Sequence, residues 1–230
     1  MQSAYRIKIC QFIYGDLIDS DSWFNKFVAP INRCYCEIHG YEYIVDRLDQ
    51  VQQDRHGNWE KVSCIKRHLH DCDYLLIMDA DACFYSHTIS IEEELLPYME
   101  WRHLMLISAD IGCETSKWNP AFANAGIILL RNLPETLDIV NEWDTATDTQ
   151  QYDYMKFQWP LEQECFNVYI EPRYTDRIKK LADYYLMNGN KGQFIRHLVA
   201  FSNEQRRMEF GRIFNSGMMA RNRYLLNMNK

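Results

Sequence analysis

Continuous apolar runs alternate along this chain with segments in which apolar residues recur every three or four positions. The continuous runs predict strands, because a strand that is buried on both faces of a sheet carries few polar residues. Residues 74–78 (YLLIM) are the most apolar of these runs, and we expect them to form a central strand. The full set of expected strands covers residues 5–14, 41–45, 74–78, 104–107, 126–130, 184–187 and 194–197.

Segments with helical periodicity lie between these runs. The first, residues 23–39, ends at Gly40, and Pro30 inside it predicts a kink or a break because proline cannot donate a backbone hydrogen bond. Further helices are expected at residues 59–70, 134–143 and 160–169, and from about residue 203 onward. Strands that alternate with helices predict an α/β fold. We expect a single domain over residues 1–230, with a mixed, mostly parallel central sheet flanked by helices.

The composition excludes some functions. With 230 residues, of which 47% are hydrophobic, the chain can bury a full core. Its net charge of −7 argues against a general nucleic-acid binder, because such proteins gain affinity mainly from Lys and Arg that neutralise phosphates. The basic C-terminal stretch, residues 196–230, holds seven Lys or Arg against two acidic residues. This is typical of a solvated helix face, and it leaves room for a weak peripheral membrane contact.

The sequence also bears on the compartment. No stretch approaches about 18 uninterrupted apolar residues, so we expect no transmembrane segment. No secretory signal is visible at the N-terminus, which predicts a cytoplasmic protein. In a reducing compartment, its eight cysteines are expected to be free thiols.

The strongest chemical signal is Asp79-Ala80-Asp81, which directly follows the most apolar run. Ligands of open α/β sheets bind at the carboxyl ends of strands, and both carboxylates can face one site because residues i and i+2 point to the same side. Their mutual repulsion favours a divalent cation, and oxygen ligands suit Mg²⁺ or Mn²⁺. Two alternatives stay open. One is a solvated turn; the other is a haloacid-dehalogenase-type phosphatase, although Cys83 stands where that motif has Thr.

A group of cysteines and histidines raises the question of zinc. Cys64, His68, His70 and Cys72 lie within nine residues. Neither Cys-x2-Cys nor His-x3-His spacing occurs, and the two histidines would lie on different faces of a helix. We therefore interpret the four as ordinary residues at a helix end.

Three further segments contain residues that suit a binding site. His197 ends the apolar run 194–197, where it is either a hydrogen-bonded core histidine or a ligand. Asn124 and Gly126 open another expected strand, where Asn can contact a sugar hydroxyl and Gly permits close backbone approach. Glu162-Gln163 lies on an expected helix. A turn before a strand explains Asn124 and Gly126 equally well. For Glu162-Gln163 the alternative is an exposed polar pair on a helix, and the context decides between the two.

Short motifs follow one another in a fixed order between Asn32 and Val199. They are Asn32-x2-Tyr35, His39-Gly40-Tyr41-x-Tyr43, Trp59-x-Lys61, Met78-Asp79-Ala80-Asp81-Ala82, Asn124-Ala125-Gly126-x4-Arg131-Asn132 with Trp143, Glu162-Gln163 and Phe194-x2-His197. This ordered set resembles the retaining α-galactosyl, α-mannosyl and α-xylosyl transferase family. That family includes fungal Golgi mannosyl- and galactosyltransferases and plant xyloglucan xylosyltransferases.

The resemblance implies a metal-dependent glycosyltransferase with a GT-A fold. It implies a nucleotide-sugar donor, with a UDP-sugar favoured over a GDP-sugar, and a glycan or other hydroxyl acceptor. The ion, Mn²⁺ or Mg²⁺, would be held by Asp79, Asp81 and His197. The residues implied around the donor are Lys61 near its phosphates, Asn124 and Gly126 at the sugar, and Glu162 and Gln163 at the reacting centre. The logic of the fold places Tyr14 near the nucleobase.

The chain departs from the family pattern in three places. Glu162 stands where the family has Asp, Ala200-Phe201 stands where it has Gly-Cys, and no membrane stem is seen. At the altered loop, Arg206, Arg207 or Arg212 could supply hydrogen bonds to the diphosphate. Retention needs either a carboxylate nucleophile, for which Glu162 is the candidate, or front-face substitution, which we favour. A non-catalytic nucleotide-sugar-binding protein stays open as a second function.

Overall fold

The structure, a computed structural model, describes residues 4–110, 122–182 and 186–228, and beyond residue 217 only the backbone of the last helix. Within these described residues, six strands form the central sheet in the order β2-β1-β3-β6-β5-β7. The strands are β1 (Ile7–Tyr14), β2 (Glu42–Leu48), β3 (Tyr74–Met78), β5 (Met105–Ala109), β6 (Ala123–Arg131) and β7 (Ile178–Leu181). β6 runs antiparallel to β3 and β5, whereas the other neighbouring strands are parallel. The mixed, mostly parallel sheet predicted from the sequence is therefore confirmed.

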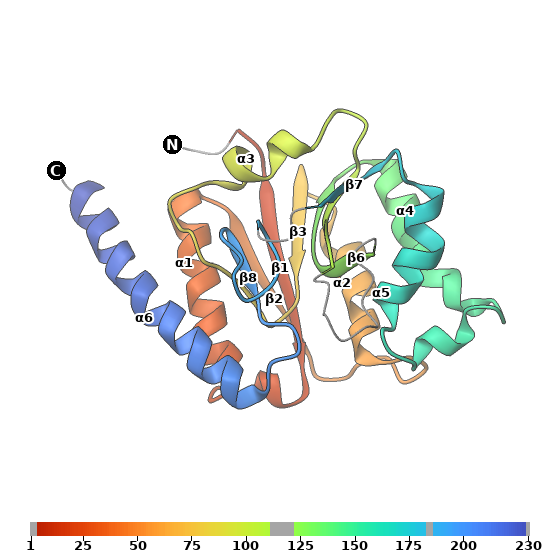
Figure 1. Ribbon diagram of the computed structural model, residues 1–230, viewed down its shortest axis with the longest axis horizontal. Helices are drawn as coiled ribbons and strands as arrows, with labels where there is room; N and C mark the ends of the chain where they lie inside the picture. The colour runs from red at the N-terminus through yellow and green to blue at the C-terminus, as the bar shows by residue number, and fades with distance from the viewer. Residues whose placement is uncertain (1–3, 111–121, 183–185, 229–230) are drawn as a thin grey trace.

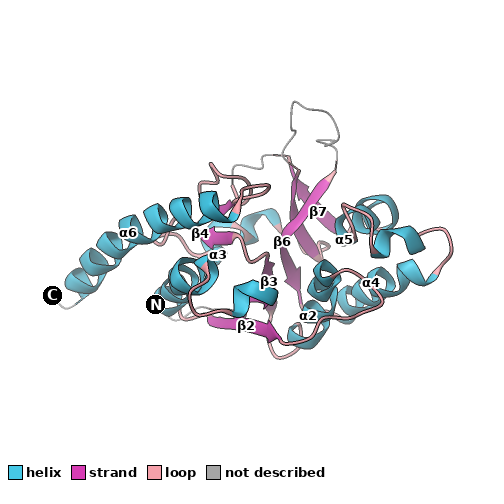
Figure 2. Cartoon of the chain, turned by 90° about the horizontal axis from the view of Figure 1, so that it is seen from below, coloured by secondary structure: helices cyan, strands magenta, loops and turns pink. Residues whose placement is uncertain are grey.

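Helices cover both faces of this sheet. Figure 1 shows α1 and α6 on one side of the sheet and α2, α4 and α5 on the other, and Figure 2 shows the same layers from below, with α6 extending past the sheet. The helices are α1 (Ala29–His39), α2 (Glu60–His68), α3 (Ile91–Glu94), α4 (Pro134–Thr145), α5 (Glu162–Cys165) and α6 (Asn203–Met228). Among the described helices, none combines the length and the apolar character that crossing a membrane would need.

Strand β1 illustrates why the apolar runs are continuous. Its residues Ile7 and Ile9 pack in the cluster that contains Tyr35 of α1, whereas Cys10 and Phe12 pack in the cluster that contains α2 and α4. Successive side chains of a strand point to opposite faces, so a strand between two helical layers must be apolar at nearly every position. The predicted central position of residues 74–78 is confirmed for the same reason, because all five residues of β3 are buried.

A second, small sheet was only half expected. β4 (Ala82–Phe84) pairs antiparallel with β8 (Ile195–His197), so that Ala82 lies opposite His197. Residues 194–197 were predicted as a strand, but β4 is too short to stand out from the sequence. This two-stranded ribbon joins the segment after β3 to a segment more than 100 residues later in the chain.

Several boundaries differ from the predictions. The helical backbone does not break at Pro30: a π-helical turn at Phe24–Val28 passes directly into α1, which begins at Ala29, and both Val28 and Ala29 have α-helical backbone angles. The strand expected at 184–187 is wrong where it can be judged: residues 183–185 lie outside the described residues, and Leu186 and Met187 form a turn. The strand at the edge of the sheet beside β5 is β7 instead. The sequence did not predict β7, because its two central residues are lysines and it therefore lacks an apolar run. The helix expected at 160–169 is α5 followed by a π-helical turn, Phe166–Ile170.

A partly buried ion-pair network ties α4 to the layer that contains α2. The two carboxylate oxygens of Asp144 lie 2.7 Å from Arg55 Nη2 and 2.7 Å from Lys66 Nζ. Burial alone would raise the pKa of Asp144, but Lys66 and Arg55 outweigh it and hold the pKa below its ordinary value.

The described cysteines are free, as predicted; Cys113 lies outside the described residues.

Candidate functional site

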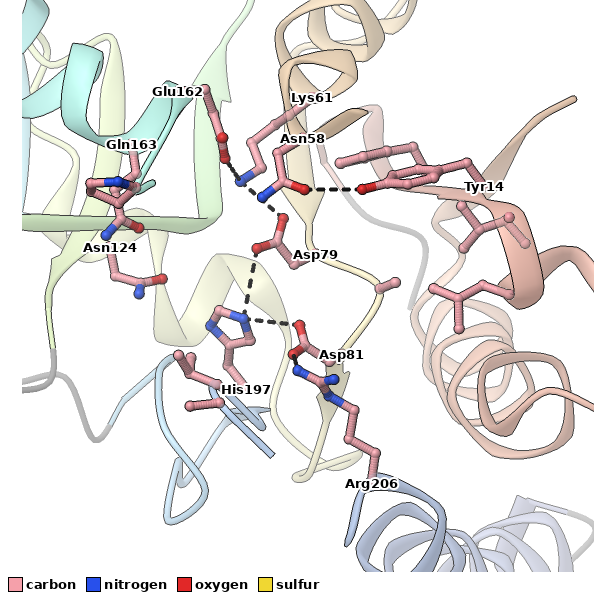
Figure 3. A pocket seen from close by; sticks show the side chains of 18 of the residues that line it. Tyr14, Asn58, Lys61, Asp79, Asp81, Asn124, Glu162, Gln163, His197 and Arg206 are labelled. Carbon is pink, nitrogen blue, oxygen red and sulfur yellow. Dashed lines mark hydrogen bonds and ion pairs between the residues drawn. The ribbon is translucent and has the colours of Figure 1, made fainter. Parts of the chain in front are cut away.

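A cavity of about 550 Å³ opens at the carboxyl ends of β1 and β3, the edge of the sheet where ligands of α/β proteins bind. The antiparallel β6 begins at the same edge, so its first residues also reach the cavity. Figure 3 shows the polar side chains that converge there. The lining residues labelled there are Tyr14, Asn58, Lys61, Asp79, Asp81, Asn124, Glu162, Gln163, His197 and Arg206.

Three of the predicted site residues meet on one side of this cavity. His197 Nε2 lies 3.1 Å from Asp81 Oδ1 and 3.7 Å from Asp79 Oδ2. One ligand atom from each residue falls within 4.8 Å of the others. Asn188 Oδ1, 3.0 Å from His197 Nδ1, orients the ring so that Nε2 faces the carboxylates. The structure therefore brings the three residues together, and their function as metal ligands stays a prediction.

The charges of this group favour a cation. Burial alone would lower the pKa of His197, but Asp81 outweighs it and holds the pKa above its ordinary value. Burial alone would raise the pKa of Asp81, but His197 and then Arg206 outweigh it and lower the pKa. Two carboxylates at a mostly buried point therefore depend on positive charge nearby, and two carboxylate oxygens with one imidazole nitrogen form a donor set that suits Mn²⁺.

Gly126 leaves the space in which the imidazole lies. A Cβ atom at this position would stand 2.1 Å from His197 Cε1 and 2.9 Å from Asn124 Oδ1. The backbone at Gly126 also accepts a hydrogen bond of 2.7 Å from the Asp79 amide, which continues the β3–β6 pairing up to the first aspartate. The close approach expected at Gly126 is therefore made by the ring of His197, which lies against the backbone of Gly126.

A buried network of polar side chains fixes the turn that carries the aspartates. Gln11 Nε2 donates to the carbonyl of Asp79 at 2.8 Å and to that of Ala82 at 3.0 Å. Gln11 Oε1 accepts from Asn32 Nδ2 at 2.8 Å and from the Tyr43 hydroxyl at 2.6 Å. Gln11 was missed in the sequence, where a single Gln inside an apolar strand is the signal that could have found it, because a buried amide must find partners.

Arg206 is the arginine that reaches the site from α6. Its Nη2 lies 2.6 Å from Asp81 Oδ2, while its guanidinium lies 5.6 Å from the centre of the Trp23 ring. Arg207 instead donates to the backbone carbonyl of Asp21, and Arg212 contacts Glu209 on its own helix. Of the three arginines considered from the sequence, the geometry thus selects Arg206.

Lys61 lies at the opposite wall between two carboxylates. Its Nζ is 2.9 Å from Asp79 Oδ1 and 2.8 Å from Glu162 Oε1, and the residue is only 2% exposed. Burial alone would lower the pKa of Lys61, but Asp79 and Glu162 outweigh it and raise the pKa. For Glu162, burial is the larger influence and raises the pKa against the opposing effect of Lys61. Lys61 therefore links the aspartate pair to Glu162.

The amide side chains at the remaining wall are held by an aspartate that sequence reasoning missed. Asp110 accepts from Asn124 Nδ2 at 3.0 Å and from Gln163 Nε2 at 3.2 Å. Gln163 Oε1 in turn accepts from the Ala125 amide at 2.9 Å. Asp110 directly follows the buried strand β5, so the signal that singled out Asp79 was present here too. The structure thus brings Asn124 and Gln163 to one wall.

The last wall contains aromatic residues. Tyr14 ends β1 and donates from its hydroxyl to Asn58 Oδ1 at 3.1 Å, and burial raises the pKa of this hydroxyl. Trp159 and Pro160 line the rim, and Trp159 is 67% exposed. Asn58 and Trp159 were not singled out from the sequence. The cavity is thus lined by a group of side chains that favours a cation, by a buried lysine, by two amide side chains and by an aromatic ring.

The group considered for zinc does not assemble as four residues. Cys64 and His68 face the sheet, where they lie near Cys10 and Asp46, whereas the side chain of His70 is 65% exposed. Cys64, His68, His70 and Cys72 therefore do not meet at one point, and Cys64 and His68 belong to a different group of side chains.

Comparisons with known proteins find a family model and a relative that match parts of the chain. Residues 19–120 match the model of a family described as the galactosyl transferase GMA12/MNN10 family. Over 113 residues the chain is 30% identical to xyloglucan 6-xylosyltransferase 4 of Arabidopsis thaliana, a match that covers 47% of this chain. The match spans only 21% of the length of that relative.

A solved structure extends the likeness to nearly the whole chain. It is the crystal structure of a glycosyltransferase involved in the glycosylation of the major capsid of PBCV-1, with a TM-score of 0.70 and 15% sequence identity. The likeness covers 90% of this chain and 98% of the other. At this identity the likeness establishes the fold, whereas the family match is confined to residues 19–120.

Proposed function

We propose that this chain, a GT-A-like glycosyltransferase related to the galactosyl transferase GMA12/MNN10 family, moves a hexose or pentose from a nucleotide-diphosphate sugar to a hydroxyl group of a glycan or another acceptor. The transfer depends on a divalent cation and retains the anomeric configuration. One observation carries the proposal: Asp79, Asp81 and His197 converge beside a cavity of about 550 Å³ at the ligand-binding edge of the sheet. The matched family and relative support glycosyl transfer over phosphate hydrolysis.

The metal-binding part of the proposal assigns Asp79, Asp81 and His197 to Mn²⁺ or Mg²⁺. Such an ion stabilises the negative charge that develops on a departing diphosphate. In the structure, the guanidinium of Arg206 is paired with the carboxylate of Asp81. We expect a bound cation to take over that role and to leave the guanidinium of Arg206 for the diphosphate, to which it can donate two parallel hydrogen bonds.

The remaining assignments follow the walls of the cavity. Lys61 supplies a second positive charge near the phosphates through its position beside Asp79. Asn124 and Gln163, fixed by Asp110, offer amide groups to the hydroxyls of the donor sugar. Tyr14 presents a flat ring on the side where a nucleobase would stack. We expect the donor to be a UDP-sugar and the acceptor to enter the cavity past its rim.

The environment of Glu162 favours front-face substitution over a covalent intermediate. Its Oε1 is bound to Lys61 at 2.8 Å, and the residue is 3% exposed, so the carboxylate serves to neutralise the lysine. Gln163 carries no carboxylate and cannot act as a nucleophile of that kind. The departing phosphate oxygen then assists deprotonation of the acceptor hydroxyl on the same face of the sugar.

The test is the release of nucleoside diphosphate from UDP- and GDP-sugars in the presence of Mn²⁺. Asp81→Asn should abolish release while the far-ultraviolet circular dichroism stays unchanged. Asp73→Asn, which alters a partly exposed carboxylate outside the cavity, should release the product at the wild-type rate. Normal release by Asp81→Asn would refute the proposal. Donor binding by the wild-type protein without any release would favour a nucleotide-sugar-binding protein instead.

A further inference from the structure

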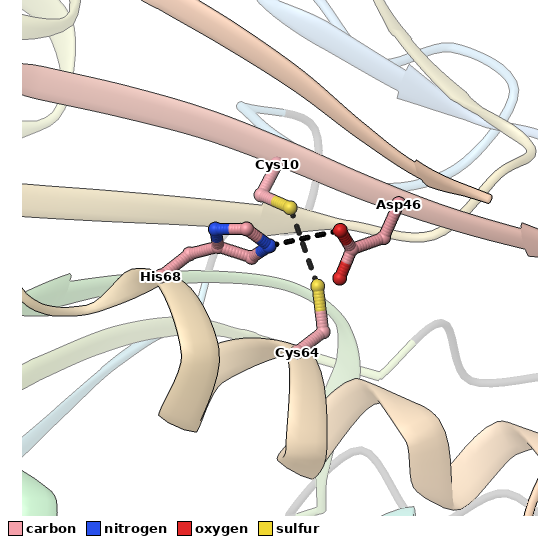
Figure 4. A group of neighbouring side chains, drawn as sticks. All are labelled: Cys10, Asp46, Cys64 and His68. Carbon is pink, nitrogen blue, oxygen red and sulfur yellow. Dashed lines mark hydrogen bonds and ion pairs between the residues drawn. The ribbon is translucent and has the colours of Figure 1, made fainter. Parts of the chain in front are cut away.

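A second group of ligand-type side chains lies on the face of the sheet that α2 covers. It consists of Cys10 from β1, Asp46 from β2, and Cys64 and His68 from α2, which we call the thiol cluster. Figure 4 shows the four side chains pointing toward one another between the strands and the helix. One ligand atom from each of the four lies within 4.8 Å of the others. None of the four lines the cavity described above.

Sheet register and helical spacing explain why the cluster forms. Asp46 is the register partner of Phe12 in the parallel β1–β2 pair, and Cys10 is two residues before Phe12, so all three side chains leave the same face. Cys64 and His68 are four residues apart on α2, which places them one turn apart on one face of the helix. The cluster therefore results from two regular elements packed against each other.

The contacts inside the cluster are close. Cys10 Sγ lies 3.2 Å from Cys64 Sγ, and His68 Nε2 lies 2.9 Å from Asp46 Oδ1. The second carboxylate oxygen of Asp46 accepts from Arg67 Nη2 at 2.8 Å and from Nε at 3.1 Å. Arg67 thus fixes the carboxylate with its other oxygen turned to the cluster, as outer partners of metal ligands do.

We propose that Cys10, Asp46, Cys64 and His68 form a four-coordinate structural site for Zn²⁺. Two sulfur, one nitrogen and one oxygen donor make a ligand set that zinc takes in tetrahedral geometry, whereas Mn²⁺ and Mg²⁺ prefer oxygen donors. This site is therefore distinct in chemistry from the group at Asp79. It does not depend on the proposed transferase function.

The charges balance in both states. Without the ion, the negative charge of Asp46 is paired with Arg67. When Zn²⁺ binds, two S–H bonds break, two Zn–S bonds form, and both thiol protons leave to water. The proton that His68 Nε2 donates to Asp46 is exchanged through water to Nδ1, so that Nε2 can bind the ion as a neutral imidazole. Two thiolates, one carboxylate and Zn²⁺ then carry one negative charge, which Arg67 again neutralises. The ion has a route in, because the side chains of Asp46 and His68 are 18% and 20% exposed.

The position of the cluster suggests what the ion would do. Cys64 comes one turn after Lys61 on α2, and β1 continues from Cys10 to Tyr14 at the cavity. An ion bound by the cluster ties α2 to β1 and β2 behind the cavity. We expect it to raise the thermal stability of the whole chain without contacting the donor.

The experiment uses reduced, metal-free full-length protein titrated with Co²⁺ and then with Zn²⁺. Co²⁺ bound to thiolates gives charge-transfer absorption in the near ultraviolet and visible bands of tetrahedral geometry, which a site of carboxylates and histidine does not give. We expect these signals to saturate at one ion per chain and to disappear when Zn²⁺ displaces Co²⁺. They should be lost in Cys64→Ser and kept in Cys72→Ser, which alters a buried thiol outside the cluster, and in Asp81→Asn.

Two further measurements keep the test decisive if a cysteine variant does not fold. His68→Gln, altered at the partly exposed rim, should bind Zn²⁺ about 10–100-fold more weakly. In the wild-type protein, Zn²⁺ should slow alkylation of Cys10 and Cys64 but not of the partly exposed Cys34. Absence of the thiolate signal in folded, reduced protein would overturn the proposal, as would a signal that survives Cys64→Ser. A Cys10–Cys64 disulfide that forms in place of metal binding would overturn it as well.

Discussion

Replacing Gly126 with alanine tests whether the position of His197 decides metal binding. The added Cβ would stand 2.1 Å from His197 Cε1 and 2.8 Å from its Nδ1, whereas ordinary contacts begin at 3.4 Å. The ring must therefore move by more than 1 Å, because Gly126 lies in β6 between two strands and cannot retreat. That displacement also strains the contact between the ring and Asn188.

The expected magnitude follows from the tolerance of metal sites. Ligand distances hold within about 0.2 Å, so a shift of more than 1 Å removes His197 from a common coordination sphere. We expect Mn²⁺ affinity to fall by about 10–100-fold and donor turnover by about 100-fold. Overpacking a filled site should also lower the unfolding free energy by about 1–3 kcal/mol.

The assay is Mn²⁺-dependent thermal stabilisation, measured together with release of nucleoside diphosphate. Gly211→Ala is the matched control, because its new Cβ would lie at an ordinary 3.7 Å from the Phe27 ring. The double variant Gly126→Ala/His197→Ala should regain part of the lost stability, since the clash is then removed. Wild-type Mn²⁺ affinity in Gly126→Ala would refute the assignment of His197 as a ligand.

Three more predictions concern charged residues. Lys61→Met should lower the unfolding free energy by about 3–5 kcal/mol in urea denaturation, because it leaves Glu162 buried without a counter-charge; adding Glu162→Leu should restore most of the loss. Arg206→Gln should bind Mn²⁺ at least as tightly as the wild type but UDP about tenfold more weakly in calorimetric titrations, and equal losses of both would contradict its assigned role. Asp144→Asn should cost about 1–3 kcal/mol at pH 7 by chemical denaturation. Because the folded pKa of Asp144 is lowered, this difference is present above the unfolded pKa of about 3.9 and shrinks as pH falls through the folded pKa, so an equal cost at pH 3 would refute it.

Much of the fold follows from local patterns. The buried strands β1, β3, β5 and β6 are apolar at nearly every position, so they stand out against the helices between them. β7 and β4 do not, because β7 is an edge strand with lysines at its centre and β4 has only three residues. Strands of this kind are defined by their partner across the sheet, and the partner is far away in the sequence.

The candidate site divides in the same way. Asp79 and Asp81 could be predicted from the residues alone, because they follow the most apolar strand. From the residues alone His197 was either a core histidine or a ligand, because only the pairing of β4 with β8 brings it to Asp81. The resemblance supplied its assignment to the metal site. Asp110 carried the same local signal as Asp79 and was overlooked.

Helix α2 carries polar residues on its buried face, and a search for apolar periodicity alone does not interpret them. Its buried face carries Lys61, Cys64 and His68 in one stripe, at positions where an inner helix face is expected to be apolar. A buried polar group is stable only with a partner, so each of these residues predicts one elsewhere in the chain. The structure supplies Glu162 and Asp79 for Lys61, Asp46 for His68, and Cys10 for Cys64. The helix alone does not identify these partners, but it does predict that they exist. On α2 the three residues mark both the cavity at Asp79 and the thiol cluster.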